Sequence, residues 1–282
     1  MTLPPFDVHR AGSVEEARAL LTRYGEDAAV ICGGTELLLL LKLGFAAYGH
    51  LVNIKSIASL GGIRADDGML TIGSTVTHRE IERSPLVLER LPALAAMERR
   101  VANIRVRSVG TLGGNLCFSD PHSDPATFLL VLDAEVEYDA TRVPLEQFLV
   151  GPYQTALEHG QLLASVHIPF PGPRIGIAHQ KFAFHERPAA TVACLVRVAD
   201  GSVDCARLAV GSVGARPVRA TAAERALAGA GLDDHAALSE AADLAAEASQ
   251  PVEDANGSVE YKAHIVRVLV QRCFKEAVVA CL

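Results

Sequence analysis

The segment that decides the fold is ICGGTELL, residues 31–38. The apolar residues 28–32 predict a short buried strand, Gly33-Gly34-Thr35 a turn, and residues 36–43 a helix that ends at Gly44. Such a turn leaves backbone N–H groups uncovered by side chains at the positively polarised start of a helix, where phosphate binds. A Gly-Gly-Thr turn that occurs alone is, however, more often a tight turn without a ligand.

A second glycine-rich segment, TLGGNL at residues 111–116, follows about eighty residues later and predicts a second turn at Gly113-Gly114-Asn115. Two such turns can hold both phosphates of a dinucleotide if they converge in space. Neither segment has the G-x-G-x-x-G pattern of nicotinamide-binding folds, and the G-x-x-x-x-G-K-[ST] pattern of nucleotide triphosphatases does not occur. The sequence therefore favours a dinucleotide site that is not of the Rossmann kind.

The chain changes character at PFPGPR, residues 169–174, which predicts a domain boundary. Before it, residues 51–54 and 69–73 predict strands, Thr77 and Glu80 have the spacing of a capping box, and residues 88–100 predict one helix. This first part mixes short strands with helices.

Beyond the boundary the strands come first and the helices follow. Residues 192–198 and 203–210 predict a β-hairpin that turns at Asp200-Gly201. Helical stretches then begin at Thr221, Asp234 and Ser258. The fold class predicted for the whole chain is α+β.

Net charge, cysteine spacing and the length of apolar stretches exclude several classes of function. The formal net charge is −7 without a long basic run, which excludes the footprint of a nucleic-acid-binding or anionic-membrane-binding protein. Six cysteines occur without a C-x-x-C pair, so the spacing predicts no metal site. No apolar stretch reaches the ~18 residues that a membrane span needs, and we expect a cytoplasmic protein.

Together, these motifs resemble a known flavoprotein family: the medium subunit of carbon monoxide dehydrogenase and the flavin domain of xanthine dehydrogenase. The similar segments keep the family's order, and they are ICGGTELL, TIGST at residues 71–75, SVGTLGGNL at 108–116, DPHSD at 120–124, Lys181-Phe182 with Arg187, VGARPVRA at 213–220 with Glu224, and Tyr261-Lys262. The resemblance covers nearly the whole chain.

The resemblance implies a two-domain architecture. Residues 1–170 are expected to form an FAD-binding domain of the vanillyl-alcohol-oxidase/PCMH type, with subdomains of about 1–57 and 58–170. Residues 175–282 are expected to form a smaller α+β C-terminal domain of the carbon monoxide dehydrogenase flavoprotein type, an antiparallel sheet plus helices.

The resemblance also implies a non-covalent FAD. Its pyrophosphate is expected against Cys32 to Thr35, with Asp124 on a polar part, Leu163 packed on the cofactor and Lys181 near the isoalloxazine. The cofactor-binding residues implied in this way are Cys32, Gly33, Gly34, Thr35, Glu36, Leu37, Thr75, Thr111, Gly114, Asn115, Cys117, Asp124, Leu163 and Lys181. Helix capping by Asp124 and a solvated strand end at Lys181 are the alternative interpretations of these two residues.

The chain departs from the family pattern at two places. Cys32 stands where the family usually has Ala, which is a sterically mild change. Arg187-Pro188 replaces a common Arg-x-x-Asp pattern, which puts in doubt any role of that carboxylate. We find no catalytic dyad, and a structural role is the favoured interpretation of His78 and His122.

The resemblance implies that molybdopterin and the [2Fe-2S] clusters belong to partner subunits, a large and a small one, in a dimer of heterotrimers. This chain would then be the oxidoreductase subunit that passes electrons to an external acceptor. Two alternatives stay open. One is a self-contained flavin-dependent reductase or oxidase of the same fold, and the other is a binding or assembly protein that has lost the flavin.

Overall fold

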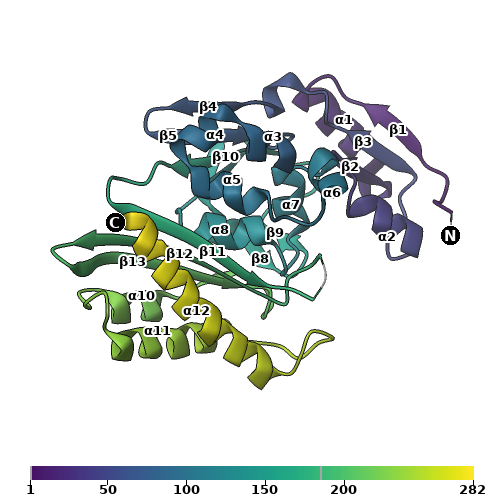
Figure 1. Cartoon of the computed structure of the whole chain (residues 1–282). Coiled ribbons are helices and arrows are strands. Elements are labelled where there is room, and N and C mark those ends of the chain that lie inside the picture. The colour runs from purple at the N-terminus through teal and green to yellow at the C-terminus, as the bar shows by residue number, and fades with distance from the viewer. Residues whose placement is uncertain (1, 185) are drawn as a thin grey trace.

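The computed structural model describes residues 2–184 and 186–282, and its N-terminal unit contains a three-stranded parallel sheet in the order β1-β3-β2 (Figure 1). The elements are β1 (Asp7–Arg10), α1 (Val14–Tyr24), the 3₁₀ turn η1 (Gly25–Asp27), β2 (Ala28–Ile31), α2 (Leu37–Leu43), β3 (His50–Asn53) and η2 (Ala58–Leu60). Ser13 caps α1, whose Ala17 and Leu21 pack against Ala28 and Val52 of the sheet. The strand, glycine turn and helix predicted at residues 28–43 are confirmed.

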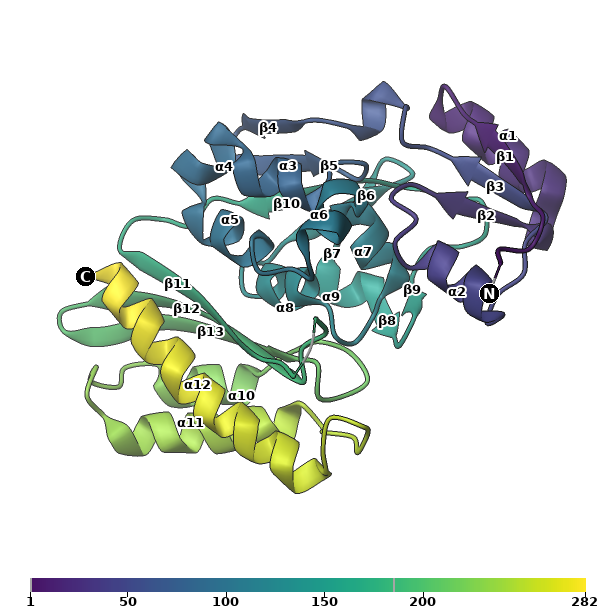
Figure 2. The ribbon, with the colours of Figure 1, turned by 45° about the vertical axis from the view of Figure 1, so that its right-hand side comes forward.

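A five-stranded antiparallel sheet in the order β4-β5-β10-β6-β7 forms the second unit. Its strands are β4 (Ile63–Asp66), β5 (Met69–Gly73), β6 (Glu135–Tyr138), β7 (Thr141–Pro144) and β10 (Leu163–Pro169), and a separate pair is formed by β8 (Leu149–Gly151) and β9 (Gln154–Thr155). The short helices in this unit are α3 (His78–Arg83), α4 (Pro85–Arg90), α5 (Pro92–Glu98), α6 (Ile104–Val109), α7 (Leu112–Phe118), α8 (Asp124–Leu130) and α9 (Leu145–Phe148). Figure 2 shows α6, α7, α8 and α9 in the middle of the molecule and α3, α4 and α5 above the C-terminal sheet.

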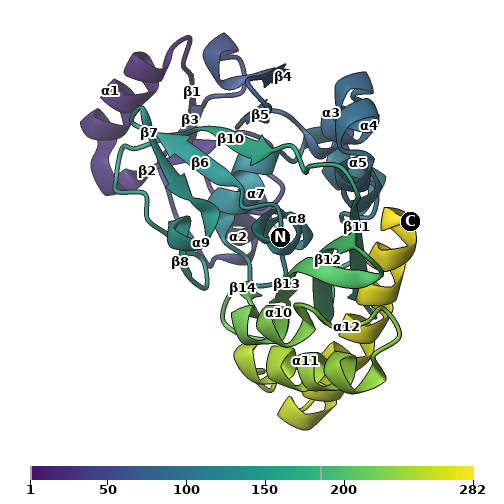
Figure 3. The same cartoon turned by 90° about the vertical axis from the view of Figure 1, so that its left-hand side faces the viewer.

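The third unit is a four-stranded antiparallel sheet with helices packed on one face. It comprises β11 (Ile175–Phe182), β12 (Ala190–Ala199), β13 (Ser202–Gly211), β14 (Val218–Arg219), α10 (Thr221–Leu227), α11 (His235–Ala248) and α12 (Val259–Cys281). Figure 3 shows α10, α11 and α12 together beneath β12 and β13. The predicted hairpin and the three predicted C-terminal helices are confirmed.

Strand β12 joins two hydrophobic cores because its side chains alternate between two faces. Val192, Cys194 and Val196 pack into the core beneath α11 and α12, whereas Ala193 and Leu195 pack into the core of the second unit. The C-terminal sheet is therefore a wall that both halves of the chain share.

Two local predictions are wrong. Residues 88–100 do not form one helix, because Pro92 lacks the N–H that a continuous helix needs and the chain divides there into α4 and α5. Gly113-Gly114-Asn115 is not a turn, because these residues lie in the first turns of α7 behind the N-cap Thr111. Over the described residues, no helix combines the length and the apolar character needed to cross a bilayer.

Candidate functional site

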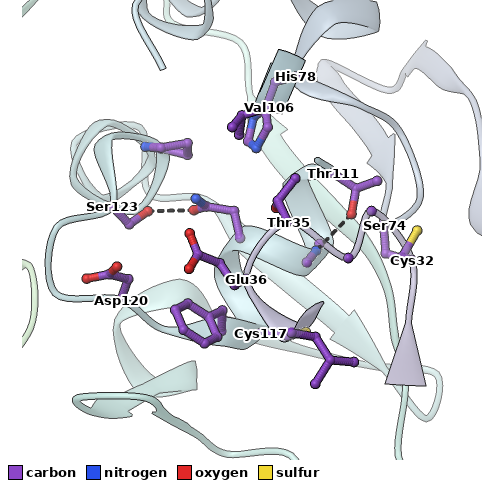
Figure 4. Close-up of a pocket in the computed structure, with 18 of the residues that line it drawn as sticks. Cys32, Thr35, Glu36, Ser74, His78, Val106, Thr111, Cys117, Asp120 and Ser123 are labelled. Atoms are coloured by element: carbon purple, nitrogen blue, oxygen red, sulfur yellow. Dashed lines mark hydrogen bonds between the residues drawn. The ribbon is translucent and has the colours of Figure 1, made fainter. Parts of the chain in front are cut away.

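A cavity of about 430 Å³ is lined by the two glycine-rich segments, by the loop before α8 and by the loop before β12. Figure 4 shows Thr35, Ser74 and Thr111 along one side, Asp120 and Ser123 along the other, and Glu36 between them. The lining thus comes from all three units of the fold.

Gly33 brings the first glycine segment into backbone contact with residues 109–110, which directly precede the second segment. A Cβ at Gly33 would lie 2.4 Å from the carbonyl oxygen of Val109 and 2.7 Å from the Cα of Gly110. Because both of these are main-chain atoms, no side chain can move to make room. The first segment therefore follows its close path over residues 109–110 only with glycine at position 33.

The second segment is held by Thr111 and by contact with the end of β5. The Thr111 hydroxyl accepts a hydrogen bond from the N–H of Gly114 at 3.1 Å, and the N–H of Gly113 donates to the carbonyl of Ser74 at 3.1 Å. A Cβ at Gly113 would lie 2.5 Å from that of Ser74. The helix capped by Thr111, in place of the predicted turn, sets how this segment faces the cavity.

Most of the residues predicted for the cofactor site line this one cavity. They are Cys32, Gly33, Gly34, Thr35, Glu36, Leu37, Thr111, Gly114, Asn115, Cys117, Asp124 and Leu163. Thr75 and Lys181 are not among its lining residues. The buried Thr75 hydroxyl donates to the carbonyl of Leu60 at 2.9 Å, while its neighbour Ser74 lines the cavity because side chains alternate along an extended chain.

Lys181 lies behind Asp124, which does line the cavity. Its Nζ is 2.8 Å from Asp124 Oδ2, and the Asp124 side chain is only 4% exposed. Asp124 does not cap α8, because Ser123 does so by accepting from the N–H of Ala126. Burial raises the pKa of the Asp124 carboxyl, and the charge of Lys181 opposes that rise.

This pair gives a prediction about stability and pH. The pKa of Asp124 in the folded chain is raised above its ordinary value of 3.8. The stability that protonated Asp124 contributes is therefore complete below pH 3.8 and is lost as the pH rises through the folded-state pKa. Lys181→Met removes the charge that opposes the rise, so at neutral pH it is expected to cost about 3–5 kcal/mol of unfolding free energy. Urea unfolding at several pH values measures the effect, which should grow with pH.

Adding Asp124→Asn to the Lys181→Met variant should recover most of this loss, since no buried charge then remains. Replacing the exposed Lys275 by Met is the control and should change the unfolding free energy by less than about 0.5 kcal/mol. A Lys181→Met protein as stable as wild type at every pH would contradict a stabilising pair.

Arg187 lies at the rim of the cavity and connects the C-terminal part of the chain with the rest. Its guanidinium is 2.8 Å from Glu36 Oε2 and 3.1 Å from Asp120 Oδ2. Burial acts to lower the pKa of Arg187, but the two carboxylates raise it overall. His122 lies beside this group, with Nδ1 2.7 Å from the carbonyl oxygen of Pro188. Arg187 thus has carboxylate partners although the family's nearby aspartate is missing.

The two thiols in the cavity wall are poor nucleophiles. Burial raises the pKa of Cys117 to about 12 and also raises the pKa of Cys32. Since the thiolate is the reactive form, both groups are inert at neutral pH. Both side chains pack in the cavity wall as small apolar groups.

Sequence reasoning missed several lining residues, among them Ser74, His78 and Ser123. Ser123 Oγ donates to Asn115 Oδ1 at 2.6 Å, which fixes that amide (Figure 4). Ser123 belongs to the DPHSD segment at residues 120–124, but that motif does not state which of its side chains faces the cavity. His78 was interpreted as structural, because no local pattern connects it with its partner Glu98, twenty residues away in the sequence.

Two family models match the chain. Residues 4–171 match the FAD binding domain in molybdopterin dehydrogenase, and residues 185–277 match the CO dehydrogenase flavoprotein C-terminal domain. Together with the glycine-lined cavity, these matches define a two-domain flavoprotein of the molybdopterin dehydrogenase class.

Similar proteins agree over the full length. The carbon monoxide dehydrogenase medium chain of Hydrogenophaga pseudoflava is 31% identical with 100% of both chains covered, and the putative xanthine dehydrogenase FAD-binding subunit of Escherichia coli K12 is 33% identical with 96% of each covered. A solved carbon monoxide dehydrogenase from Hydrogenophaga pseudoflava, which lacks the Mo-pyranopterin moiety, superimposes with a TM-score of 0.96 at 33% identity over 100% of both chains. Quinoline 2-oxidoreductase from Pseudomonas putida 86 gives a TM-score of 0.94 at 28% identity, covering 100% of this chain and 99% of that one.

This chain belongs to the family of FAD-binding subunits of molybdenum hydroxylases, which are oxidoreductases. The expected α+β fold with an FAD-binding domain followed by a C-terminal domain is confirmed.

Proposed function

We propose that this chain is the electron-transfer subunit of a heteromeric molybdenum hydroxylase. It takes electrons from [2Fe-2S] centres of a small partner subunit and passes them to an external acceptor. A large partner subunit carries the molybdopterin at which the substrate is hydroxylated. The three chains assemble as a dimer of heterotrimers, in which residues 1–170 hold the FAD and residues 175–282 form the C-terminal domain.

The observation that carries this proposal is the meeting of two glycine-rich segments at one cavity. Gly33 allows residues 32–35 to lie directly on residues 109–110, so the main chain of both segments reaches the same space. Backbone N–H groups without covering side chains are suited to a diphosphate. The relatives named as FAD-binding subunits match the chain along nearly its whole length.

The other lining residues also suit a dinucleotide. Asp124 Oδ1 is buried and has no hydrogen-bond partner among the described residues, and His179 Nε2 lies 3.6 Å away. An unpaired buried carboxylate oxygen that lines a cavity is suited to accept from a ligand hydroxyl or N–H. Leu163 supplies an apolar surface, and Lys181 acts on the cofactor through Asp124.

FAD, when bound, supplies the redox chemistry by accepting electrons singly or in pairs. The chain itself orients the cofactor and encloses it. Arg187 bridges Glu36 and Asp120 at the rim, which ties together the segments that form the mouth of the cavity. Because Cys32 and Cys117 are neutral thiols, they do not attack the flavin as nucleophiles.

A reconstitution experiment tests the proposed function. The purified chain is expected to bind one FAD and to show at most slow diaphorase activity by itself. Mixing the FAD-loaded chain with the reduced iron-sulfur partner should bleach the flavin absorbance in a stopped-flow instrument, because the flavin accepts the partner's electrons. The same chain freed of FAD is the control and should leave the partner reduced.

Two results would contradict the proposal. A well-folded chain that stays colourless in saturating FAD would indicate a binding or assembly protein. Steady turnover of a specific substrate by the isolated chain would indicate a self-contained reductase or oxidase.

A further inference from the structure

His78 and Glu98 form a buried pair at the wall of the cavity. His78 is the first residue of α3, Glu98 is the last residue of α5, and the imidazole Nδ1 lies 2.7 Å from Glu98 Oε2. The side chains are 3% and 0% exposed to solvent, yet His78 lines the cavity. Figure 4 shows the imidazole beside Val106, at the end of the cavity near Thr35.

The charge of Glu98 has one partner. In the described part of the chain, its Oε2 contacts His78 and its Oε1 has no hydrogen-bond partner. A fully buried carboxylate costs several kcal/mol unless an opposite charge balances it, and the imidazole of His78 is the group in contact with Glu98 that can supply that charge. An imidazole that carries both protons donates Nδ1–H to Glu98 and has a second donor at Nε2.

The imidazole lies directly beside the glycine segments. Its Cδ2 is 3.5 Å from the point where a Cβ on Gly110 would stand, and Thr35 Oγ1 is 3.4 Å from the same point. The backbone N–H of His78 donates to the carbonyl of Gly110 at 3.1 Å. His78, Thr35 and Gly110 therefore form one continuous wall.

The cationic groups beside Asp120 and Asp124 are engaged elsewhere. Arg187 is paired with two carboxylates at the rim, and Lys181 lies behind Asp124. His122 directs Nδ1 to the carbonyl of Pro188. Among the described lining residues, His78 is thus the side chain next to residues 33–35 that can carry a positive charge.

We propose that His78, held by Glu98, donates a hydrogen bond from Nε2 to an anionic oxygen of the dinucleotide diphosphate. This inference rests on the proposed function for the identity of the ligand as FAD. Glu98 is the positioning residue, since it fixes the ring and balances its charge. The glycine segments supply neutral donors, and His78 supplies the positive charge that the diphosphate needs.

The test replaces the pair by neutral groups and compares two ligands. His78→Phe with Glu98→Gln keeps a ring and leaves no buried charge. FAD affinity, measured by titration of the apoprotein, is expected to fall roughly 10- to 100-fold, which is the loss of one charge-assisted hydrogen bond. Riboflavin has no phosphate, so its affinity, measured by competition with FAD, should change less than about 3-fold.

A second histidine–glutamate pair in the same chain, with His167 buried and Glu137 half-buried, provides the control. His167 Nε2 lies 2.9 Å from Glu137 Oε2, and neither residue lines the cavity. The variant His167→Phe with Glu137→Gln should leave FAD affinity within about 2-fold of wild type. This variant measures how much FAD affinity falls when the loss of a histidine–glutamate pair affects only the stability of the fold.

Three outcomes would overturn the inference. FAD affinity could be unchanged in the His78 variant, FAD and riboflavin affinity could fall together, or the control could lose as much FAD affinity as the His78 variant. Each would make the His78–Glu98 pair a structural link between α3 and α5. Failure of the wild-type chain to bind FAD is a different result, which would contradict the proposed function instead.

Discussion

Gly33→Ala is expected to weaken FAD binding roughly 10- to 100-fold. The added Cβ would stand 2.4 Å from the Val109 carbonyl oxygen, so residues 32–35 must move away from residues 109–110. Forcing an extra methyl group into a packed interior costs typically ~1–3 kcal/mol, and a site built from both segments loses its alignment when they separate. Titration of the apoprotein with FAD measures the affinity, and thermal unfolding measures the accompanying loss of stability.

Gly61→Ala is the matched control for this variant. Its Cβ would meet the nearest atoms, Ala58 O and Thr75 Oγ1, at 3.5 and 3.6 Å, which are ordinary contact distances. FAD affinity of the control should stay within about 2-fold of wild type. Wild-type affinity in the Gly33→Ala protein would show that the close approach of the two segments is not needed for binding.

Gly176→Ala is expected to have the largest effect on folding. A Cβ at this position of β11 would lie 1.8 Å from the carbonyl oxygen of Ala277 and 2.7 Å from the N of Cys281, both in α12. Since α12 packs directly on the strand backbone, the helix must lift off the sheet along its last turns. We expect a loss of ~3 kcal/mol or more in unfolding free energy, measured by urea denaturation.

The control for Gly176→Ala is Gly172→Ala, four residues earlier in the loop that precedes β11. A Cβ there meets no atom within 4 Å, and the backbone angle is not in the left-handed region. Its unfolding free energy should therefore stay the same or rise by up to ~1 kcal/mol, because alanine restricts the unfolded chain. Equal stability of the two variants would contradict the close packing of α12 on β11.

Local patterns predicted most of the regular structure. The strand at residues 28–31, the capping box at Thr77 and Glu80, and the hairpin at Asp200-Gly201 are short-range features, and the structure contains each of them. Helix α7 was not predicted, because two adjacent glycines have low helix propensity. The N-cap at Thr111 and the contact of Gly113 with Ser74 outweigh this low helix propensity. The contact with Ser74 is a tertiary interaction, which a local pattern does not contain.

The candidate site was predictable where it is continuous in sequence. Residues 32–37 line the cavity as one stretch, so one motif was enough to find them. His78 depends on Glu98, and Lys181 on Asp124, through packing between separate elements that no local pattern encodes. Thr75 was assigned in place of Ser74 because a motif does not state which of two neighbouring side chains faces inward.

The alternation along β12 limits how this chain can change over evolution. A larger side chain at position 194 must be accommodated beneath α12, whereas one at position 195 must be accommodated by the helices on the opposite side. Consecutive residues of this strand are therefore constrained by different halves of the molecule. A chimera that joins one half to its counterpart from a distant relative would combine a sheet face with a core of different shape.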